Sequence, residues 1–259
     1  PELSMEIQAA LGSDIAMLFD ECPPYPCDEK YAAKSLALTT RWARRCKDWV
    51  TANSPRSGEG RQLHFGIVQG SIYADLREQS ARELVELDFD GYAIGGVSVG
   101  EPEPEMMQAI EFTVPHLPKN KARYAMGLGT PAQMIELVAR GVDMFDCVLP
   151  TRVARNGTAY TRFGAIGIKG GQFKADFRPI EEGCECFACK HFTRAYLRHL
   201  LNVNEILGLR MLSVHNTHMY LQTMADARKH LAAGTFGEYY RQFIADFRPS
   251  AKVMAQRKK

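Results

Sequence analysis

Short apolar runs alternate with longer amphipathic stretches through the first 150 residues of the chain. The apolar runs cover residues 14–19, 64–68, 91–94, 123–126 and 142–149, and most of them end at glycine or a polar residue. Helical periodicity fills the intervals at residues 27–53, 72–87, 103–114 and 131–140. Strands and helices that alternate in this way are typical of βαβ units. The pattern therefore predicts an α/β fold built on a parallel sheet.

The residues at the ends of these predicted strands are mostly polar or small. They include Asp20, Cys22, Gln69, Gly95, Gly96, Gly127 and Asp146. In a parallel α/β fold the carboxyl ends of the strands converge on the ligand site. A closed TIM-type (β/α)8 barrel needs eight strands, whereas this pattern supplies five. We therefore expect an incomplete barrel that lacks about three N-terminal βα units, and the opening at Pro1 without an initiating methionine leads to the same expectation.

The pattern changes after Pro150. Residues 157–173 are rich in glycine and alternate, which predicts an antiparallel ribbon. A cysteine cluster follows, then helices at 191–204 and 215–233 and an amphipathic aromatic stretch at 236–247. We expect residues 1–156 to carry the βα units and the ligand pocket, and residues 157–259 to carry the ribbon, a metal-binding subdomain and the closing helices. Residues 52–61 are predicted to form a polar loop.

Composition narrows the class of protein without identifying it. The 259 residues are 46% hydrophobic and 24% charged, as in ordinary globular proteins. No apolar run approaches the roughly 20 residues that span a bilayer, so a membrane role has no support. The net charge of +2 is mild, but residues 150–200 hold nine basic side chains against four acidic ones. The basic residues are Arg152, Arg155, Arg162, Lys169, Lys174, Arg178, Lys190, Arg194 and Arg198. This local excess is suited to a nucleic-acid partner.

The cysteine cluster is the strongest local signal. Cys184, Cys186 and Cys189 are too closely spaced for a disulfide framework, and thiolates at this spacing can hold one zinc ion while the chain turns. His215 is our candidate for the fourth ligand, and His218, His191 and His199 remain alternatives that spacing alone does not separate. Four protein ligands leave no open position, which predicts a structural zinc. Reduced thiols also predict a cytoplasmic protein.

Two carboxylates and an amide are candidates for chemistry at the strand ends. Asp146 interrupts an apolar stretch, and an aspartate there can attack an anomeric carbon and hold it covalently, or simply cap a turn. Asp20 could accept hydrogen bonds from a purine-like base, or act as a helix N-cap. Gln69 could donate to or accept from the edge of a base. Gly95 and Gly96 would let a flat ligand approach the backbone, although such pairs also occur in ordinary turns.

Several motifs together closely resemble the bacterial tRNA-guanine transglycosylases. They are Phe19-Asp20-Glu21-Cys22-Pro23-Pro24-Tyr25-Pro26, Val68-Gln69-Gly70, Ala93-Ile94-Gly95-Gly96-Val97-Ser98-Val99-Gly100-Glu101, Tyr124-Ala125-Met126-Gly127, Met144-Phe145-Asp146-Cys147-Val148-Leu149-Pro150-Thr151-Arg152 and the cysteine cluster. The match runs through essentially the whole chain, in the order that the family has.

The resemblance implies a role for each matching position. Asp146 would be the nucleophile that displaces guanine at wobble position 34 of tRNA and forms a covalent intermediate, before 7-aminomethyl-7-deazaguanine takes its place in queuosine biosynthesis. The base pocket would consist of Asp20, Cys22, Gln69, Gly95, Gly96, Val97, Glu101, Met126 and Gly127. Arg152 and Arg155 would contact the anticodon loop of a tRNA with a U-G-U sequence, and Cys184, Cys186, Cys189 and His215 would bind structural zinc in a cytoplasmic homodimer.

The chain also departs from the family's pattern. The N-terminal third, which in the family supplies the first barrel strands, a second essential aspartate and an aromatic lid, has no counterpart here, so this chain by itself is expected to be inactive. One alternative is a non-catalytic tRNA-binding accessory subunit of the same fold, against which the intact motif around Asp146 argues. Another is a barrel glycosidase that would use Asp20 and Asp146 as its two carboxylates.

Overall fold

The computed structural model describes residues 1–53 and 60–247. It divides into two compact units. Unit 1 comprises Pro1–Leu128 and Arg140–Asp146, and unit 2 comprises Gly129–Ala139 and Cys147–Lys259. The sequence-based division into residues 1–156 and 157–259 is a prediction of domains, not of these compact units, and it stays a prediction.

Unit 1 is built on a five-stranded parallel sheet. Its strands are β1 (Ile15–Met17), β2 (Leu63–Val68), β3 (Gly91–Ile94), β4 (Ala122–Ala125) and β5 (Met144–Phe145), and they neighbour one another in chain order. All four residues of β3 are buried, as expected for a strand covered on both faces. Sequential parallel pairing is the arrangement found in the wall of a (β/α)8 barrel. The α/β fold with five barrel strands is confirmed.

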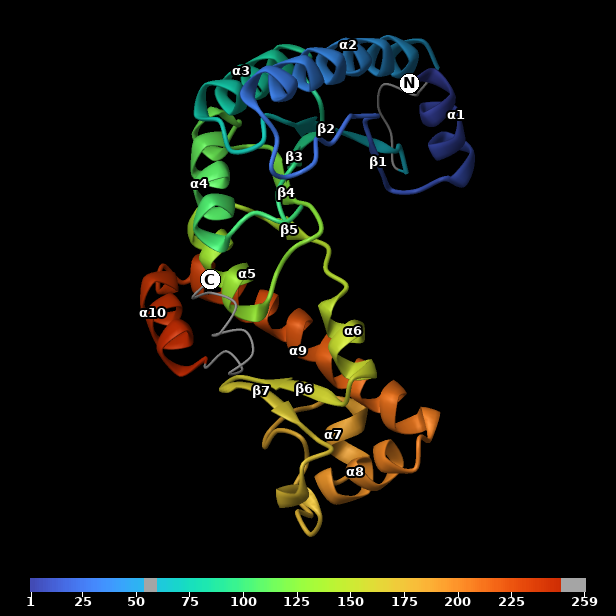
Figure 1. The fold of residues 1–259 in the computed structure, drawn as a ribbon, viewed down its shortest axis with the longest axis vertical. Coiled ribbons are helices and arrows are strands. Elements are labelled where there is room, and N and C mark those ends of the chain that lie inside the picture. Colours follow the sequence, from blue (N-terminus) through green and yellow to red (C-terminus); the bar gives the residue numbers. More distant parts are fainter. Residues whose placement is uncertain (54–59, 248–259) are drawn as a thin grey trace. The chain divides into compact units, whose positions relative to one another are not determined.

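Helices precede and connect the strands of unit 1. They are α1 (Glu2–Leu11), α2 (Glu29–Asn53), α3 (Ala74–Glu86) and α4 (Glu103–Thr113), followed by the 3-10 turn η1 (Val114–His116). Figure 1 shows α2, α3 and α4 along one side of the sheet. Each has a buried stripe, such as Leu36, Ala43 and Cys46 on α2, and Leu36 packs against Leu76 of α3. Of the predicted loop at 52–61, residues 54–59 lie outside the described residues.

The predicted strand at 142–149 is wrong in its second half. Only Met144–Phe145 pairs with β4, and helix α6 (Leu149–Arg155) begins four residues later. Pro150 stands in the first turn of α6, where its missing N–H is not needed. The apolar residues Val148 and Leu149 therefore start a helix instead of prolonging the strand. Asp146 lies just beyond the end of β5.

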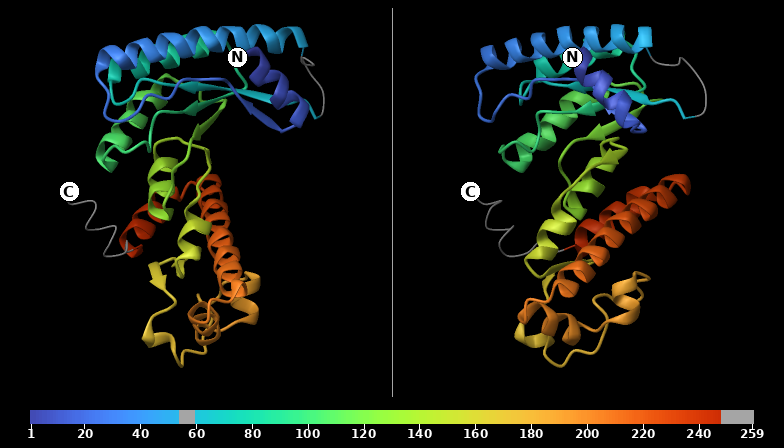
Figure 2. Two further views of the ribbon diagram at one scale, coloured as in Figure 1. Left: turned by 45° about the vertical axis from the view of Figure 1, so that its right-hand side comes forward. Right: turned by 90° about the vertical axis from the view of Figure 1, so that its right-hand side faces the viewer.

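Unit 2 combines a small ribbon with helices. The predicted ribbon is confirmed as the antiparallel pair β6 (Thr158–Thr161) and β7 (Gly164–Gly167). The other elements are α5 (Pro131–Ala139), α6, η2 (Gly171–Phe173), α7 (Phe187–His191), α8 (Arg194–Asn202), α9 (Ile206–Ala232) and α10 (Phe236–Asp246). Figure 2 shows the long helix α9 with α6 beside it.

Two helix boundaries in unit 2 differ from those predicted. The expected helix at 191–204 is interrupted, because α7 ends at His191 and α8 begins at Arg194. The Thr193 side chain caps α8 by accepting a hydrogen bond from the Tyr196 N–H at 3.2 Å. The expected helix at 215–233 begins nine residues earlier, so His215 lies inside α9. Within residues 1–53 and 60–247, none of the helices has the length and apolar content that a membrane span requires.

Candidate active site and metal centre

Three cysteines and one histidine of unit 2 form a group that could hold a metal ion. The ligand atoms of Cys184, Cys186, Cys189 and His215 all lie within 4.8 Å of one another. The His215 Nδ1 atom is 3.7, 3.5 and 3.4 Å from the three sulfurs in that order. Tetrahedral zinc with bonds of about 2.3 Å to sulfur and about 2.05 Å to nitrogen requires N···S separations of about 3.6 Å. The donor set and its spacing therefore fit zinc.

The far side of the His215 ring is held by the backbone of β6. Nε2 lies 2.7 Å from the Tyr160 carbonyl oxygen, to which it can donate a proton. This bond favours the tautomer whose Nδ1 lone pair faces the sulfurs. The next residue, Asn216, accepts a hydrogen bond from the Tyr160 N–H at 2.8 Å and donates one to the Pro150 carbonyl at 2.9 Å. Both side chains are fully buried, so α9 fixes β6 and α6 around the metal group.

Cys186 has the surroundings of a thiolate. It is the N-cap of α7, and its sulfur accepts a hydrogen bond from the Cys189 N–H. Contact with the Cys189 side chain, opposed by burial and supported by His215, lowers the pKa of Cys186 well below that of a free thiol. The three alternative histidines lie outside the group: His191 stacks on Phe187, His199 on Tyr196, and His218 lines a cavity. The fourth position thus belongs to His215.

Asp20 and Gln69 meet at the carboxyl end of the sheet in unit 1. Gln69 Nε2 donates to Asp20 Oδ2 at 2.6 Å, and the Gln69 backbone N–H donates to Ser80 at 3.0 Å. The Gln69 side chain is 1% exposed, and its Oε1 atom has no hydrogen-bond partner within residues 1–53 and 60–247. Burial raises the pKa of Asp20, although the Gln69 bond partly opposes this. A buried acceptor without a partner is costly, and a donor on a bound ligand would satisfy it.

Gly95 and Gly96 make room for the Gln69 side chain. A Cβ on Gly95 would lie 2.5 Å from an Ile67 methyl carbon, and one on Gly96 would lie 2.4 Å from Gln69 Oε1. Gly96 also has a φ of +62°, which disfavours other residues. The Cys22 thiol adjoins the same group. Burial and Asp20 raise the pKa of Cys22, whereas the Gly96 N–H and the Gln69 side chain lower it. Asp20, Cys22, Gln69 and Gly96 therefore converge.

The loop after β3 carries the next predicted pocket residues. Val97 is 5% exposed, and the Glu101 carboxylate accepts hydrogen bonds from the Ser98 N–H and from the Val99 N–H, the latter at 2.9 Å. Ser98 has a φ of 61°, an uncommon conformation for a residue with a side chain. The carboxylate thus holds a tight turn whose backbone amides point at Glu101.

Asp146 is oriented by the neighbouring strand β4. Its Oδ1 atom accepts from the Tyr124 hydroxyl at 2.6 Å and from the Gly127 N–H at 2.7 Å. Tyr124 pairs in register with Met144, and Asp146 follows Met144 by two residues, so the two side chains share a face. Met126, the first residue after β4, is half-buried. Burial and the bond to Asp146 raise the pKa of Tyr124.

Arg152 and Arg155 are exposed on α6 in unit 2. Several other basic residues of the positive region have carboxylate partners: Arg178 and Arg194 pair with Asp176, Arg162 with Glu181, and Lys190 with Glu185. No ion pair of Arg152 or Arg155 is found in the part of the chain that the structure describes. These two guanidinium groups are therefore open to an anion in solution.

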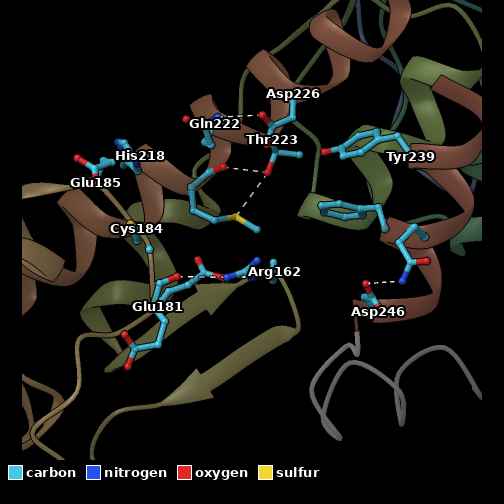
Figure 3. Close-up of a pocket in the computed structure, with 15 residues that line it drawn as sticks. Arg162, Glu181, Cys184, Glu185, His218, Gln222, Thr223, Asp226, Tyr239 and Asp246 are labelled. Atoms are coloured by element: carbon cyan, nitrogen blue, oxygen red, sulfur yellow. Dashed lines mark hydrogen bonds and ion pairs between the residues drawn. The ribbon is translucent and has the colours of Figure 1, made fainter. Parts of the chain in front are cut away.

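Unit 2 also contains a cavity of about 570 Å³ between the cysteine loop, α9 and α10. Figure 3 shows that polar side chains on its walls bond to one another, as in the pairs Arg162–Glu181 and Gln222–Asp226. Gln242 also donates a hydrogen bond to Asp246. None of the predicted base-pocket residues lines it. Groups satisfied in this way do not call for a ligand, so the candidate active site remains the group at the strand ends of unit 1.

Sequence reasoning missed three residues that shape these sites. Tyr124 orients Asp146, Asn216 fixes the helix that carries His215, and Arg77 donates hydrogen bonds to the Gly95 and Gly96 carbonyls. Tyr124 could have been found from the alternation of β4, which directs it to the same side as Met126. Arg77 and Asn216 have no comparable signal, because each lies in an ordinary helical pattern.

Comparison with known proteins gives one consistent result. The sequence model of the family described as "Queuine tRNA-ribosyltransferase" matches residues 1–249. The protein of that name from Pelotomaculum thermopropionicum is 52% identical to this chain over 95% of the chain's length. The proteins of that name from Bacillus subtilis and Symbiobacterium thermophilum are 51% and 53% identical to it, over 97% and 94% of its length. The match covers 65%, 65% and 60% of those relatives, so the chain spans a little under two thirds of their length. The chain belongs to the queuine tRNA-ribosyltransferase family.

Proposed function

We propose that this chain is the base-exchange and zinc-binding part of a tRNA-guanine transglycosylase, a pentosyltransferase that replaces guanine at wobble position 34 of tRNA. The observation that supports this most directly is the pair of hydrogen bonds from Tyr124 and Gly127 to one oxygen of Asp146. They hold the carboxylate at a strand end, as a nucleophile requires. Asp20, Gln69 and Gly96 stand at other strand ends of the same sheet.

The first half of the proposed reaction removes guanine. Asp146 attacks C1′ of the ribose, the bond between C1′ and N9 breaks, and its electron pair leaves with the base, which takes up a proton. The ribose is then joined to Asp146 through a new C–O bond. Asp20 accepts hydrogen bonds from the ring N–H and amine of the base, the Gly96 N–H donates to its carbonyl oxygen, Gln69 lies against the ring edge, and Met126 covers one face.

The second half uses the same pocket for 7-aminomethyl-7-deazaguanine. The N9 atom of the incoming base attacks C1′ and loses its proton, and Asp146 is released as a carboxylate. Glu101 lies against the Ser98 and Val99 amides, close to where a cationic aminomethyl group would be recognised. Val99 and Cys22 match the bacterial forms that use this base. A carbon in place of N7 makes the new base harder to protonate, so the product is retained.

The metal in unit 2 is proposed to be zinc with a structural role. Cys184, Cys186, Cys189 and His215 would hold it, and four protein ligands leave no position for a catalytic water. Zinc would therefore supply stability and not chemistry. Its contribution would be to tie the cysteine loop to α9 beside the ribbon.

The tRNA partner and the assembly follow from the surface of unit 2. Arg152 and Arg155 would bind phosphates or bases of an anticodon loop that contains U-G-U. We also propose a homodimer that forms near the zinc region, where Phe187 and Tyr196 are 55% and 44% exposed and Phe192 stacks on Tyr196. Large exposed aromatic side chains of this kind favour protein contacts. A tRNA substrate and reduced metal-binding thiols are consistent with the cytoplasm.

The decisive experiment measures incorporation of radiolabelled guanine into unmodified tRNA. We would compare the chain with a fusion to the portion of the Bacillus subtilis relative that the match does not cover. Each protein is also made with the substitution Asp146→Asn and, as a control, with Asp143→Asn. Asp143 is a nearby carboxylate that accepts a hydrogen bond from the Arg123 N–H. We expect exchange by the fusion, abolished by Asp146→Asn and kept by Asp143→Asn. Exchange that survives Asp146→Asn would contradict the mechanism, and tRNA binding without exchange would support an accessory subunit.

A further inference from the structure

Arg77 on α3 is a buried cation whose bonding partners are backbone carbonyls. Its side chain is 0% exposed. Nε donates to the Ser71 carbonyl at 2.6 Å, Nη1 to the Gly95 carbonyl at 2.7 Å and the Val68 carbonyl at 3.4 Å, and Nη2 to the Gly96 carbonyl at 3.1 Å. The guanidinium thus joins the ends of β2 and β3 beneath the predicted base pocket.

The Arg77 guanidinium is costly to bury, because it hydrogen-bonds to carbonyls and not to a carboxylate. Burial lowers the pKa of Arg77 to about 10, which still leaves it charged at neutral pH, and Glu101 and Cys22 oppose the shift. The fold therefore keeps a buried positive charge on the Gly95 and Gly96 carbonyls.

The bonded carbonyls connect Arg77 to the pocket. The Gly95 oxygen and the Gly96 N–H belong to one peptide group, and a cationic donor on the oxygen makes that N–H a stronger donor. Gly96 borders the group that contains Asp20 and Gln69, because a Cβ built on it would lie only 2.4 Å from Gln69 Oε1, and its N–H lowers the pKa of the Cys22 thiol beside them. The Gly96 N–H is a donor and can therefore bind only an acceptor. In a guanine-type base, the carbonyl oxygen is such an acceptor, and it lies next to the ring N–H that would donate a hydrogen bond to the Asp20 carboxylate.

We propose that Arg77 is a positioning residue that polarises the Gly95–Gly96 peptide, so that the Gly96 N–H binds the carbonyl oxygen of a guanine-type base. This inference rests on the proposed function. As the base leaves with the electron pair of the broken C1′–N9 bond, negative charge spreads to that oxygen before N9 is protonated. A donor that is fixed in place beforehand stabilises such charge more than it stabilises the neutral base.

The test compares guanine with 6-thioguanine, which keeps the ring N–H and the amine but replaces the oxygen with a weaker acceptor. Dissociation constants are measured by calorimetry for the chain, Arg77→Met and Arg77→Lys. Arg82→Met is the control, since Arg82 is an exposed residue of the same helix that pairs with Glu78. We expect Arg77→Met to weaken guanine binding about tenfold and 6-thioguanine binding much less, with Arg77→Lys between the two and the control unchanged. An equal loss for both bases would mean a purely structural role and would overturn the inference.

A second measurement does not depend on the ligand. In protein labelled with 15N-glycine, polarisation predicts that the Gly96 amide proton moves upfield in Arg77→Met while the glycine resonances of unit 2 stay in place. An unmoved Gly96 resonance overturns the inference even if bases bind. If neither the chain nor the fusion binds either base yet the resonance moves, the proposed function fails while the polarised peptide stands.

Discussion

The metal group of unit 2 and the base pocket of unit 1 differ in how far the protein supplies hydrogen-bond partners for their polar atoms. In the metal group, the His215 Nδ1 faces three sulfurs, its Nε2 faces a carbonyl, and the adjoining Asn216 bonds to two backbone segments. In the pocket, Gln69 Oε1 is buried without a partner in residues 1–53 and 60–247, and Asp20 has a raised pKa. The groups that orient the metal ligands are satisfied within the fold, whereas the base pocket leaves a buried acceptor that a ligand can satisfy.

Breaking the metal group should have the largest effect. Metal binding supplies roughly 10 kcal/mol or more of apparent free energy in small zinc domains. We therefore expect Cys186→Ser to lose zinc and to unfold the cysteine loop and ribbon of unit 2. Zinc content by mass spectrometry and the melting temperature by circular dichroism would show this. Cys27→Ser, which changes a thiol outside the group, should keep both. A zinc-free variant that melts like the parent would refute the structural role.

Filling the pocket should have the next largest effect. Gly96→Ala would place a Cβ 2.4 Å from Gln69 Oε1 in a backbone conformation with φ of +62°. We expect guanine affinity to fall at least about 30-fold, or about 2 kcal/mol, with one zinc ion retained. Calorimetry measures guanine affinity at the pocket of unit 1, and zinc analysis measures whether unit 2 keeps its metal. The control is Gly167→Ala, where a Cβ meets nothing within 4 Å. Loss of zinc in Gly96→Ala would show that the regions are not independent.

The pH dependence of base binding should report Asp20. Burial raises its pKa above the usual value, and only the ionised carboxylate can accept both hydrogen bonds from the base. Affinity should therefore be full above the raised pKa and decline as the pH falls through it, at a higher pH than an exposed aspartate would give. Asp20→Asn should bind roughly tenfold more weakly and lose this dependence. Titrations at a series of pH values decide the point, and an unchanged profile in Asp20→Asn would assign the effect to another group.

The smallest expected effect concerns Tyr124. Tyr124→Phe removes one hydrogen bond to Asp146 while Gly127 keeps the other, so the free energy of unfolding should fall by about 1 kcal/mol. Urea denaturation measures this change. Tyr31→Phe removes a hydroxyl that donates to Glu21 on the exposed surface, and it should cost less. Equal losses in the two variants would mean that the Tyr124 bond is no stronger than a surface contact.

The parallel sheet and the three metal-binding thiols were predictable because their signals are local. Each strand is a short apolar run, and Cys184, Cys186 and Cys189 are close enough in the chain to share one ion without any knowledge of the fold. The prediction failed where one local signal fits two structures. The apolar residues Val148 and Leu149 could extend a strand or start a helix, and Pro150 in the first turn accompanies the helix.

The sequence by itself determined the chemical inventory of this protein: a carboxylate, an amide and glycines at strand ends, and a thiolate cluster. Only the tertiary structure decided which distant groups complete each site. His215 lies 26 residues beyond Cys189, Tyr124 reaches Asp146 across 22 residues, and Arg77 reaches Gly95 across 18. Strand register and helix packing bring these residues together, and periodicity along the chain reports that a residue is buried but not what it meets there.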